Sequence, residues 1–187
     1  FKIDGSKSKD NIISKTVVSD LIGSGKFILP SAYEVNKGSR YKLKDSFAYW
    51  QQLNIDRIVT VEAVKSAGGM YTVTFELVDI YKSQKNLTNE DKEKRKKSVI
   101  LSKTYENIKK EHFQALAHHI SNVVYEAIVG IKGNFTSRLA YIKRGDESLS
   151  KPGKYRRFSL MVADYDGQNA KELVTAYSPL MSPTWSP

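Results

Sequence analysis

Cysteine is absent from this chain of 187 residues. Its absence excludes disulfides, thiolate catalysis and cysteine-ligated zinc, although it does not fix the cellular compartment. Long apolar runs are also missing, and none approaches the roughly 18 residues that a membrane-spanning helix needs. No such helix is therefore expected. The first residue is Phe1 and not methionine, so the lack of a leader sequence carries no information.

Acidic residues are fewer than basic ones. The chain has 20 Asp and Glu residues and 30 Lys and Arg residues, which gives a net charge of +10. A basic surface attracts nucleic acid through counterion release. Here the charge is spread along the chain, which favours an ordinary solvated surface. The dense cluster Lys94 to Lys97 follows the acidic residues Glu90, Asp91 and Glu93, and a mixed-sign run of this kind indicates an exposed loop over residues 82–97. We expect no nucleic-acid binding.

The first 130 residues alternate between helical and strand-like apolar patterns. Asp10 can cap a first helix, and Gly23 can end it. Two β-branched and alternating runs separated by Ala67 to Gly69 predict an antiparallel hairpin, and a third strand is expected to pair with its second strand. The predicted helices are 12–22, 46–53 and 109–129, and the predicted strands are 58–64, 71–77 and 98–105. This pattern predicts an α/β domain with a small mixed sheet and two main helices.

From Asn134 the chain is all strand and turn, so the domain boundary is expected between residues 1–133 and 134–187. Three short apolar runs follow one another, and the turn from Asp164 to Asn169 contains an Asp-Gly pair typical of hairpins. A three-stranded meander followed by the opening of another is typical of the first blade of a β-propeller, here truncated. One blade cannot bury both of its faces without neighbours.

Histidine occurs three times, at His112, His118 and His119, all on the last predicted helix. A metal pair is conceivable, but the useful zinc spacing on a helix is i, i+4, and no third ligand joins them at a matching spacing. We therefore expect no metal site. For His118 and His119 we expect hydrogen bonds at the helix edge or toward the sheet.

Other candidate chemistry is weaker. Ser24-Gly25-Lys26 lacks the full glycine spacing of a phosphate loop and follows a helix instead of preceding one. Asp164 and Asp166 flank a tight turn, where carboxylates usually form the turn. No serine lies in a nucleophile elbow. The residues thus indicate no catalytic site and no cofactor, and they favour a binding or scaffold role.

Several sequence segments together resemble one family, TolB, the periplasmic component of the bacterial Tol–Pal envelope system. The phrase from Gly130 to Tyr141 and the terminal Leu180 to Pro187 are the most specific. Two departures are Asn54 and Val61, which stand where the family usually has glycine. The matching phrases are residues 18–27, 50–56, 71–79, 118–141, 164–167 and 180–187.

The resemblance implies an N-terminal α/β domain followed by a six-bladed propeller, in a non-enzymatic periplasmic scaffold. It implies contact with the lipoprotein Pal mainly through the propeller, and with TolA through an N-terminal extension. It also implies roles in outer-membrane integrity, cell division and bacteriocin import, without membrane insertion. Phe1 resembles the last residue of the family's first strand, so most of that strand is expected to be missing. Partner-binding residues on this chain remain unknown.

Two alternatives stay open. Propeller-bearing serine peptidases also carry Trp-Ser-Pro-type repeats, and this reading predicts a hydrolase domain with a Gly-x-Ser-x-Gly elbow beyond Pro187. A basic nucleic-acid-binding domain is the other alternative, and it predicts retention on DNA or RNA at physiological salt.

Overall fold

The computed structural model describes residues 12–31, 43–82, 98–145 and 156–186. The chain divides into two compact units, Phe1–Gly133 and Asn134–Pro187, and each is described here by itself. In the first unit the structure has α1 (Ile12–Gly23), α3 (Leu43–Gln52), β1 (Arg57–Lys65), β2 (Tyr71–Asp79), β3 (Val99–Ile108) and α5 (Phe113–Val129), with single 3-10 turns at Ala67–Gly69 and Lys110–His112.

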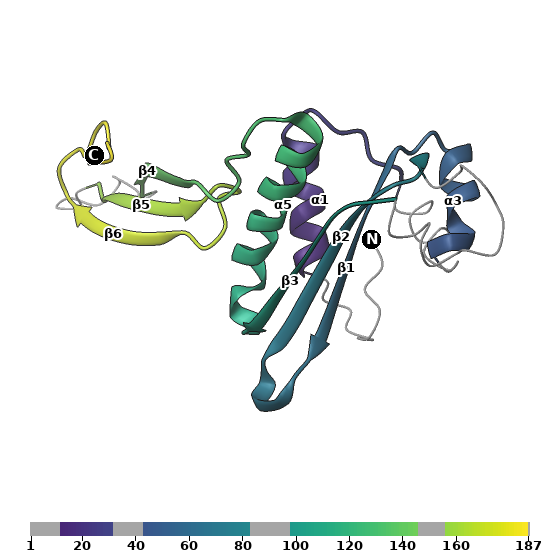
Figure 1. Cartoon of the computed structure of the whole chain (residues 1–187). Helices are drawn as coiled ribbons and strands as arrows, with labels where there is room; N and C mark the ends of the chain where they lie inside the picture. The colour runs from purple at the N-terminus through teal and green to yellow at the C-terminus, as the bar shows by residue number, and fades with distance from the viewer. Residues whose placement is uncertain (1–11, 32–42, 83–97, 146–155, 187) are drawn as a thin grey trace. The chain divides into compact units, whose positions relative to one another are not determined.

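The sheet of the first unit has the order β1-β2-β3 (Figure 1), and both neighbouring pairs are antiparallel. The predicted mixed sheet is therefore wrong for the described residues. The short connection 66–70 between β1 and β2 permits only an antiparallel pair, because a parallel pair needs a long crossover. The register of β1 on β2 is unbroken from Arg57 opposite Asp79 to Lys65 opposite Tyr71. The β2–β3 pair has two irregularities.

One face of this sheet carries the main core. The alternation along β2 places Val73, Phe75 and Leu77 on one face, and all three are fully buried. Helices α1 and α5 lie side by side against that face (Figure 1). The remaining buried members of this core are Ile13, Val17, Leu21, Val59, Val61, Phe113, Leu116, Ala117, Ile120 and Val124.

The apolar stripe of α5 is buried only over the first three turns of the helix. Phe113 through Val124 supplies the buried positions, whereas Ile128, in the last turn, is 39% exposed. Helix α1 behaves similarly, since Ile22 at its end is 52% exposed. Gly130 ends α5 in the left-handed conformation, with φ 81° and its N–H bonded to the carbonyl of Glu126, as a C-terminal glycine is expected to do.

Helix α3 contributes to a second, smaller cluster. Trp50 packs with Ile58 of β1 and with Ile80, just past β2. Because Ile58 alternates with the core residue Val59, this cluster uses the opposite face of β1 from the main core. Phe47, Tyr49, Leu53 and Ile55 pack around the cluster.

The second unit is a three-stranded antiparallel meander of β4 (Arg138–Arg144), β5 (Phe158–Asp164) and β6 (Lys171–Ala176). Phe135, ahead of β4, is 2% exposed and lies edge-on to the ring of Tyr165 in the β5–β6 turn, with 5.5 Å between ring centroids. That contact closes one end of the meander.

Asn54, which ends the α3 turn, has a positive φ of 54°. The left-handed conformation costs a residue with a Cβ roughly 1–2 kcal/mol, and asparagine tolerates it best after glycine. We expect Asn54→Ala to lower the free energy of unfolding by about 1 kcal/mol, while Asn54→Gly leaves it unchanged or raises it. Chemical denaturation can be followed by the fluorescence of the buried Trp50, because Trp185 is already 60% exposed.

Gln52→Ala is the matched control, because Gln52 is exposed and helical in the same turn. It should cost nothing, since alanine favours the helix. Equal losses for Asn54→Ala and Asn54→Gly would contradict a backbone origin of the effect.

Candidate functional site

The three histidines do not converge on one site. His118 is buried, and its Nδ1 lies 2.9 Å from Oδ2 of Asp20. His119 lies edge-on to the ring of Tyr105 at 5.6 Å between centroids. His112 is largely exposed beside Glu111 at 3.7 Å. Within the described ranges, no group of three or more histidine, aspartate or glutamate side chains could hold a metal ion.

The Asp20–His118 pair joins α1 to α5 inside the core. The side chains of Asp20 and His118 are 1% and 3% exposed, and α1 and α5 pack against each other around them. The expected hydrogen bond of His118 at the helix edge or toward the sheet is wrong, because the imidazole bonds to the neighbouring helix. A hydrogen bond between buried, oppositely charged or polar groups fixes the relative register of two helices that apolar packing alone would leave freer to slide. The arrangement is structural.

Ser24-Gly25-Lys26 forms the C-terminal cap of α1. The N–H of Ser24 donates to the carbonyl of Asp20 (3.0 Å), and the N–H of Gly25 donates to Ile22 (2.9 Å). The hydroxyl of Ser24 donates to the carbonyl of Leu21 (2.6 Å) and accepts from the N–H of Lys26 (3.3 Å). These donors are used within the cap, so the segment has no row of free N–H groups for a phosphate.

The Asp164–Asn169 segment is the hairpin turn between β5 and β6, as predicted. Oδ1 of Asp166 accepts from the N–H of Gln168 (2.9 Å), and Oδ2 of Asp164 accepts from Nδ2 of Asn169 (2.6 Å). Gly167 and Asn169 both have positive φ, at 80° and 52°. Both carboxylates thus bond within the turn.

The Lys94 to Lys97 cluster lies outside the described residues.

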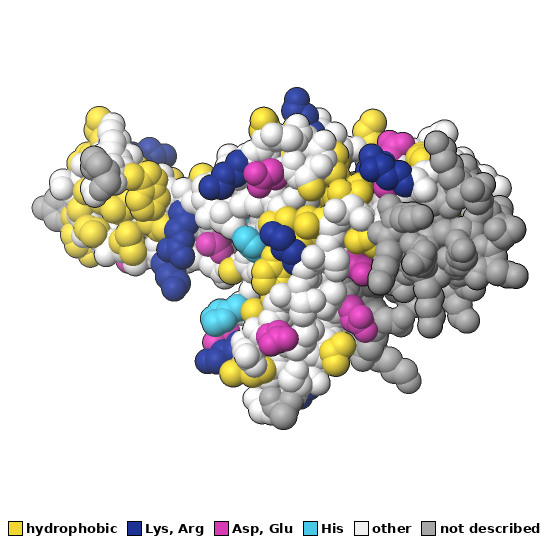
Figure 2. All heavy atoms as spheres, viewed as in Figure 1, with side chains coloured by type: hydrophobic (Ala, Val, Ile, Leu, Met, Phe, Trp, Pro, Cys, Tyr) yellow, Lys and Arg dark blue, Asp and Glu magenta, His cyan; other side chains and the backbone are white. Residues whose placement is uncertain are grey.

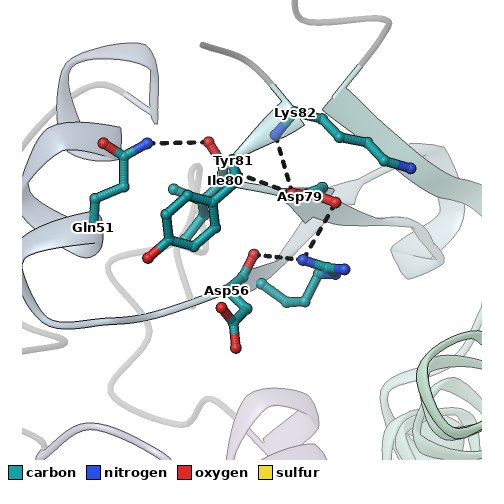
Figure 3. A network of polar contacts seen from close by, with 7 residues as sticks. Gln51, Asp56, Asp79, Ile80, Tyr81 and Lys82 are labelled. Atoms are coloured by element: carbon teal, nitrogen blue, oxygen red, sulfur yellow. Dashed lines mark hydrogen bonds and ion pairs between the residues drawn. The ribbon is translucent and has the colours of Figure 1, made fainter.

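A polar network at the exit of β2 escaped the sequence analysis (Figure 3). The carboxylate of Asp79, 5% exposed, accepts from the N–H groups of Tyr81 (3.0 Å) and Lys82 (3.1 Å) through Oδ1. Its Oδ2 lies 3.3 Å from the guanidinium of Arg57, which also donates to the carbonyl of Asp56 (3.0 Å). A buried carboxylate with all these donors is satisfied in the way buried charge requires.

The same network fastens α3 to the sheet. Nε2 of Gln51 donates to the carbonyl of Ile80 (3.3 Å), and the N–H of Ile80 donates to the carbonyl of Asp56 (3.1 Å). Hydrogen bonds therefore connect three elements at one place (Figure 3), namely helix α3, the start of β1 and the exit of β2. In the sequence, this network was marked only by an aspartate, Asp79, at the end of an alternating apolar strand. The hydrogen-bond partners of Asp79 could not be inferred from residue spacing.

Tyr105 carries a buried hydroxyl that forms no hydrogen bond within the described part of the chain. Its ring stacks on Phe75 with 6.3 Å between centroids, and burial raises the pKa of the phenol. An unsatisfied buried polar group costs free energy, so this hydroxyl opposes the stability of the core.

The second unit exposes an apolar sheet face. Cross-strand partners share a face of a sheet, and here Ile142, Leu160 and Val174 are such partners across three strands. None of the side chains on this face is buried, and Val174 is 51% exposed. Figure 2 shows apolar side chains gathered over this unit. This face is named the open face below, and its ends carry the charged residues Arg138, Arg144, Asp164 and Lys171. Its apolar residues are Ala140, Ile142, Phe158, Leu160, Val162, Val174 and Ala176.

The segment after β6 adds more apolar surface. Tyr177 is 68% exposed, Met181 80% and Trp185 60%. Exposed apolar surface on this scale marks an interaction surface. The described helices include none long and apolar enough to span a bilayer.

The chain thus combines an α/β unit that has its own core with a separate three-stranded β-meander that exposes apolar side chains. Comparison with known proteins shows what the chain is similar to. Residues 1–86 match the family described as the TolB amino-terminal domain. The predicted resemblance to TolB is confirmed, and the chain is similar to TolB proteins over nearly all of its length.

Three relatives illustrate the match, each described as a Tol-Pal system protein TolB. The protein of Hydrogenovibrio crunogenus is 32% identical over 94% of this chain and 36% of its own length. That of Coxiella burnetii is 30% identical over 95% of this chain and 37% of its own. That of Legionella pneumophila is 34% identical over 98% and 38%. The chain thus spans little more than a third of the length of these curated relatives.

Removing one member of the Asp20–His118 pair should be costly. Asp20→Ala leaves a buried imidazole without this hydrogen bond, and we expect a loss of at least about 2 kcal/mol in the free energy of unfolding. Replacing both residues by leucine should recover most of that loss, because an apolar pair needs no hydrogen bond. Denaturant titration of the single and double variants measures both effects.

The exposed Glu111–His112 pair, at 3.7 Å, is the matched control with the same chemistry. Glu111→Ala should cost under about 1 kcal/mol. A loss for Asp20→Ala no larger than for Glu111→Ala would show that the buried pair does not stabilise the two-helix contact.

Removing the Tyr105 hydroxyl should not destabilise the protein. We expect Tyr105→Phe to raise the melting temperature slightly or leave it unchanged, because it deletes a buried polar atom without a partner. Tyr71→Phe, at a half-buried ring on the neighbouring strand whose hydroxyl is not such an atom, should give no gain. A loss above about 1 kcal/mol for Tyr105→Phe would mean that the hydroxyl is satisfied in solution.

Proposed function

We propose that this chain is the front part of a periplasmic Tol–Pal component that acts through protein–protein contacts and not through catalysis. The sequence relationship to TolB proteins over 94–98% of the chain supports this proposal. Its use of no cofactor is part of the same proposal. Among the described residues the polar groups singled out by sequence serve caps, turns and the core, which agrees with a scaffold.

The single observation that carries the proposal is the open face of the second unit. A sheet whose apolar side chains are uncovered needs another layer, and repeated meanders supply it to one another. We assign β4, β5 and β6 to the first blade of a propeller, six-bladed as the resemblance implies. The further blades belong to sequence outside this chain, and they would cover Leu160, Val162 and their neighbours.

The first unit has a different role in this proposal. Its sheet is already covered by α1 and α5, and the Asp79 network ties α3 to the same sheet. A domain with a complete core can hold an attached propeller and a terminal extension without itself supplying binding residues. We therefore place the contacts with Pal mainly on the propeller and those with TolA on an N-terminal extension.

The biological consequences follow from those contacts. A scaffold between inner-membrane and outer-membrane components supports outer-membrane integrity and constriction during division, and imported bacteriocins can exploit it. Coupling between two partners needs only an extension whose ordering depends on which partner is bound.

Affinity capture with the full-length protein tests the proposal. We expect purified full-length protein to retain both Pal and TolA, and the 187-residue chain, which lacks most of the propeller, to lose Pal. Retention of neither partner by a folded full-length protein would overturn the proposal. A hydrolase domain following the propeller in the full-length sequence would favour the peptidase alternative instead.

A further inference from the structure

Four exposed basic residues gather at one end of the second unit. Lys143 and Arg144 end β4, and Arg156 and Arg157 lead into β5. The strands still pair here, because Arg144 lies opposite Phe158 and the N–H of Gly145 donates to the carbonyl of Arg157 (2.8 Å). The two short basic pairs are therefore neighbours across the hairpin. We refer to these four residues as the basic end.

The four cations point to both faces of the sheet. Arg144 shares the open face with Phe158, and alternation puts Arg156 on that face as well. Lys143 lies opposite Ser159, on the other face with Arg157. All four side chains are exposed. The charge thus surrounds the end of the hairpin and does not line a groove.

Among the described residues, the ion pair of this cluster is with Glu172; Asp146 and Glu147, in the connecting segment, lie outside those residues. Arg157 pairs with Glu172 of β6 at 2.7 Å, and hydrogen bonds donated by Thr175, Ser159 and Arg157 lower the pKa of that carboxyl. For Lys143, Arg144 and Arg156, no ion pair occurs within the ranges that the structure describes.

The opposite end of the same sheet differs. Arg138 begins β4 and Lys171 begins β6, but Asp164 and Asp166 lie in the turn beside them. Among the described residues, the charge of the meander is therefore polarised along its strands, and the excess of cations lies at the basic end.

We propose that the basic end binds an anionic lipid surface. A membrane surface needs only clustered, exposed cations, and each Lys or Arg near it strengthens attachment roughly fivefold. An acidic protein partner would need a shaped and desolvated contact, and single-stranded nucleic acid would need a basic groove that follows its backbone. The basic end, with cations splayed over both faces of a hairpin, fits a flat anionic surface best. This inference is independent of the proposed Tol–Pal role.

Vesicle co-sedimentation with the chain tests this assignment. The probes are vesicles of phosphatidylcholine alone and vesicles with about one third phosphatidylglycerol, near 0.1 M salt, where exposed charges still interact over about 10 Å. We expect binding to the anionic vesicles only. Arg144→Glu with Arg156→Glu should weaken that binding at least about tenfold, since two cations are lost and two anions gained.

Arg138→Glu with Lys171→Glu is the matched control. It makes the same change in net charge on the same face of the same sheet, at the opposite end. We expect a much smaller loss of binding, and circular dichroism should show that both variants remain folded.

Three results would overturn the proposal. The first is no binding of the chain to anionic vesicles. The second is an equal loss for both double variants, which would reduce the effect to net charge. The third is capture by immobilised polyglutamate or by DNA, in the same salt, without capture by anionic vesicles, which would assign the basic end to an acidic protein or to nucleic acid.

Discussion

The stability of each unit depends on whether a second layer of structure covers its sheet. In the first unit α1 and α5 bury one face of β1-β2-β3, and the burial of Val73, Phe75 and Leu77 is complete. Non-directional apolar burial supplies most of the stability of such a unit. Directional contacts then select one arrangement: the Asp20–His118 bond fixes α1 against α5, and Asp79 fixes α3 at the exit of β2. The second unit has the pleat and register of a stable sheet, but its open face lacks the second layer.

This asymmetry separates what each unit can do. A self-contained α/β unit provides a rigid anchor, whereas an incomplete meander has to find another layer. In the proposed function that layer is the next blade of a propeller, and the TolB proteins to which the chain is similar are longer than this chain. The basic end lies at the end of the sheet and off the middle of its faces, so covering the open face would leave those cations accessible at the rim. The two proposed contacts of the second unit are therefore compatible.

Much of this architecture was predictable because its signals are local. The alternation from Tyr71 to Leu77 and the apolar stripe of α5 gave element types and buried faces, and the Asp-Gly turn gave the β5–β6 hairpin. The antiparallel hairpin of β1 and β2 and the pairing of β3 with β2 were predicted correctly. The mixed character predicted for the whole sheet is wrong for the described residues, where both strand pairs are antiparallel. The Asp20–His118 bond joins residues 98 positions apart, so no local pattern could indicate it. The Asp79 network likewise depends on backbone groups that carry no residue identity.

Hydrogen exchange of the 187-residue chain tests the central claim most directly, because exchange reports the stability of each segment separately. The account predicts that amides in β2 and in the middle of α5 exchange slowly, near the limit of global unfolding of the first unit. Amides in β4, β5 and β6 should exchange faster by orders of magnitude, because no second layer covers the open face. Protection of β5 equal to that of β2 in the monomeric chain would contradict the claim that the second unit is incomplete on its own.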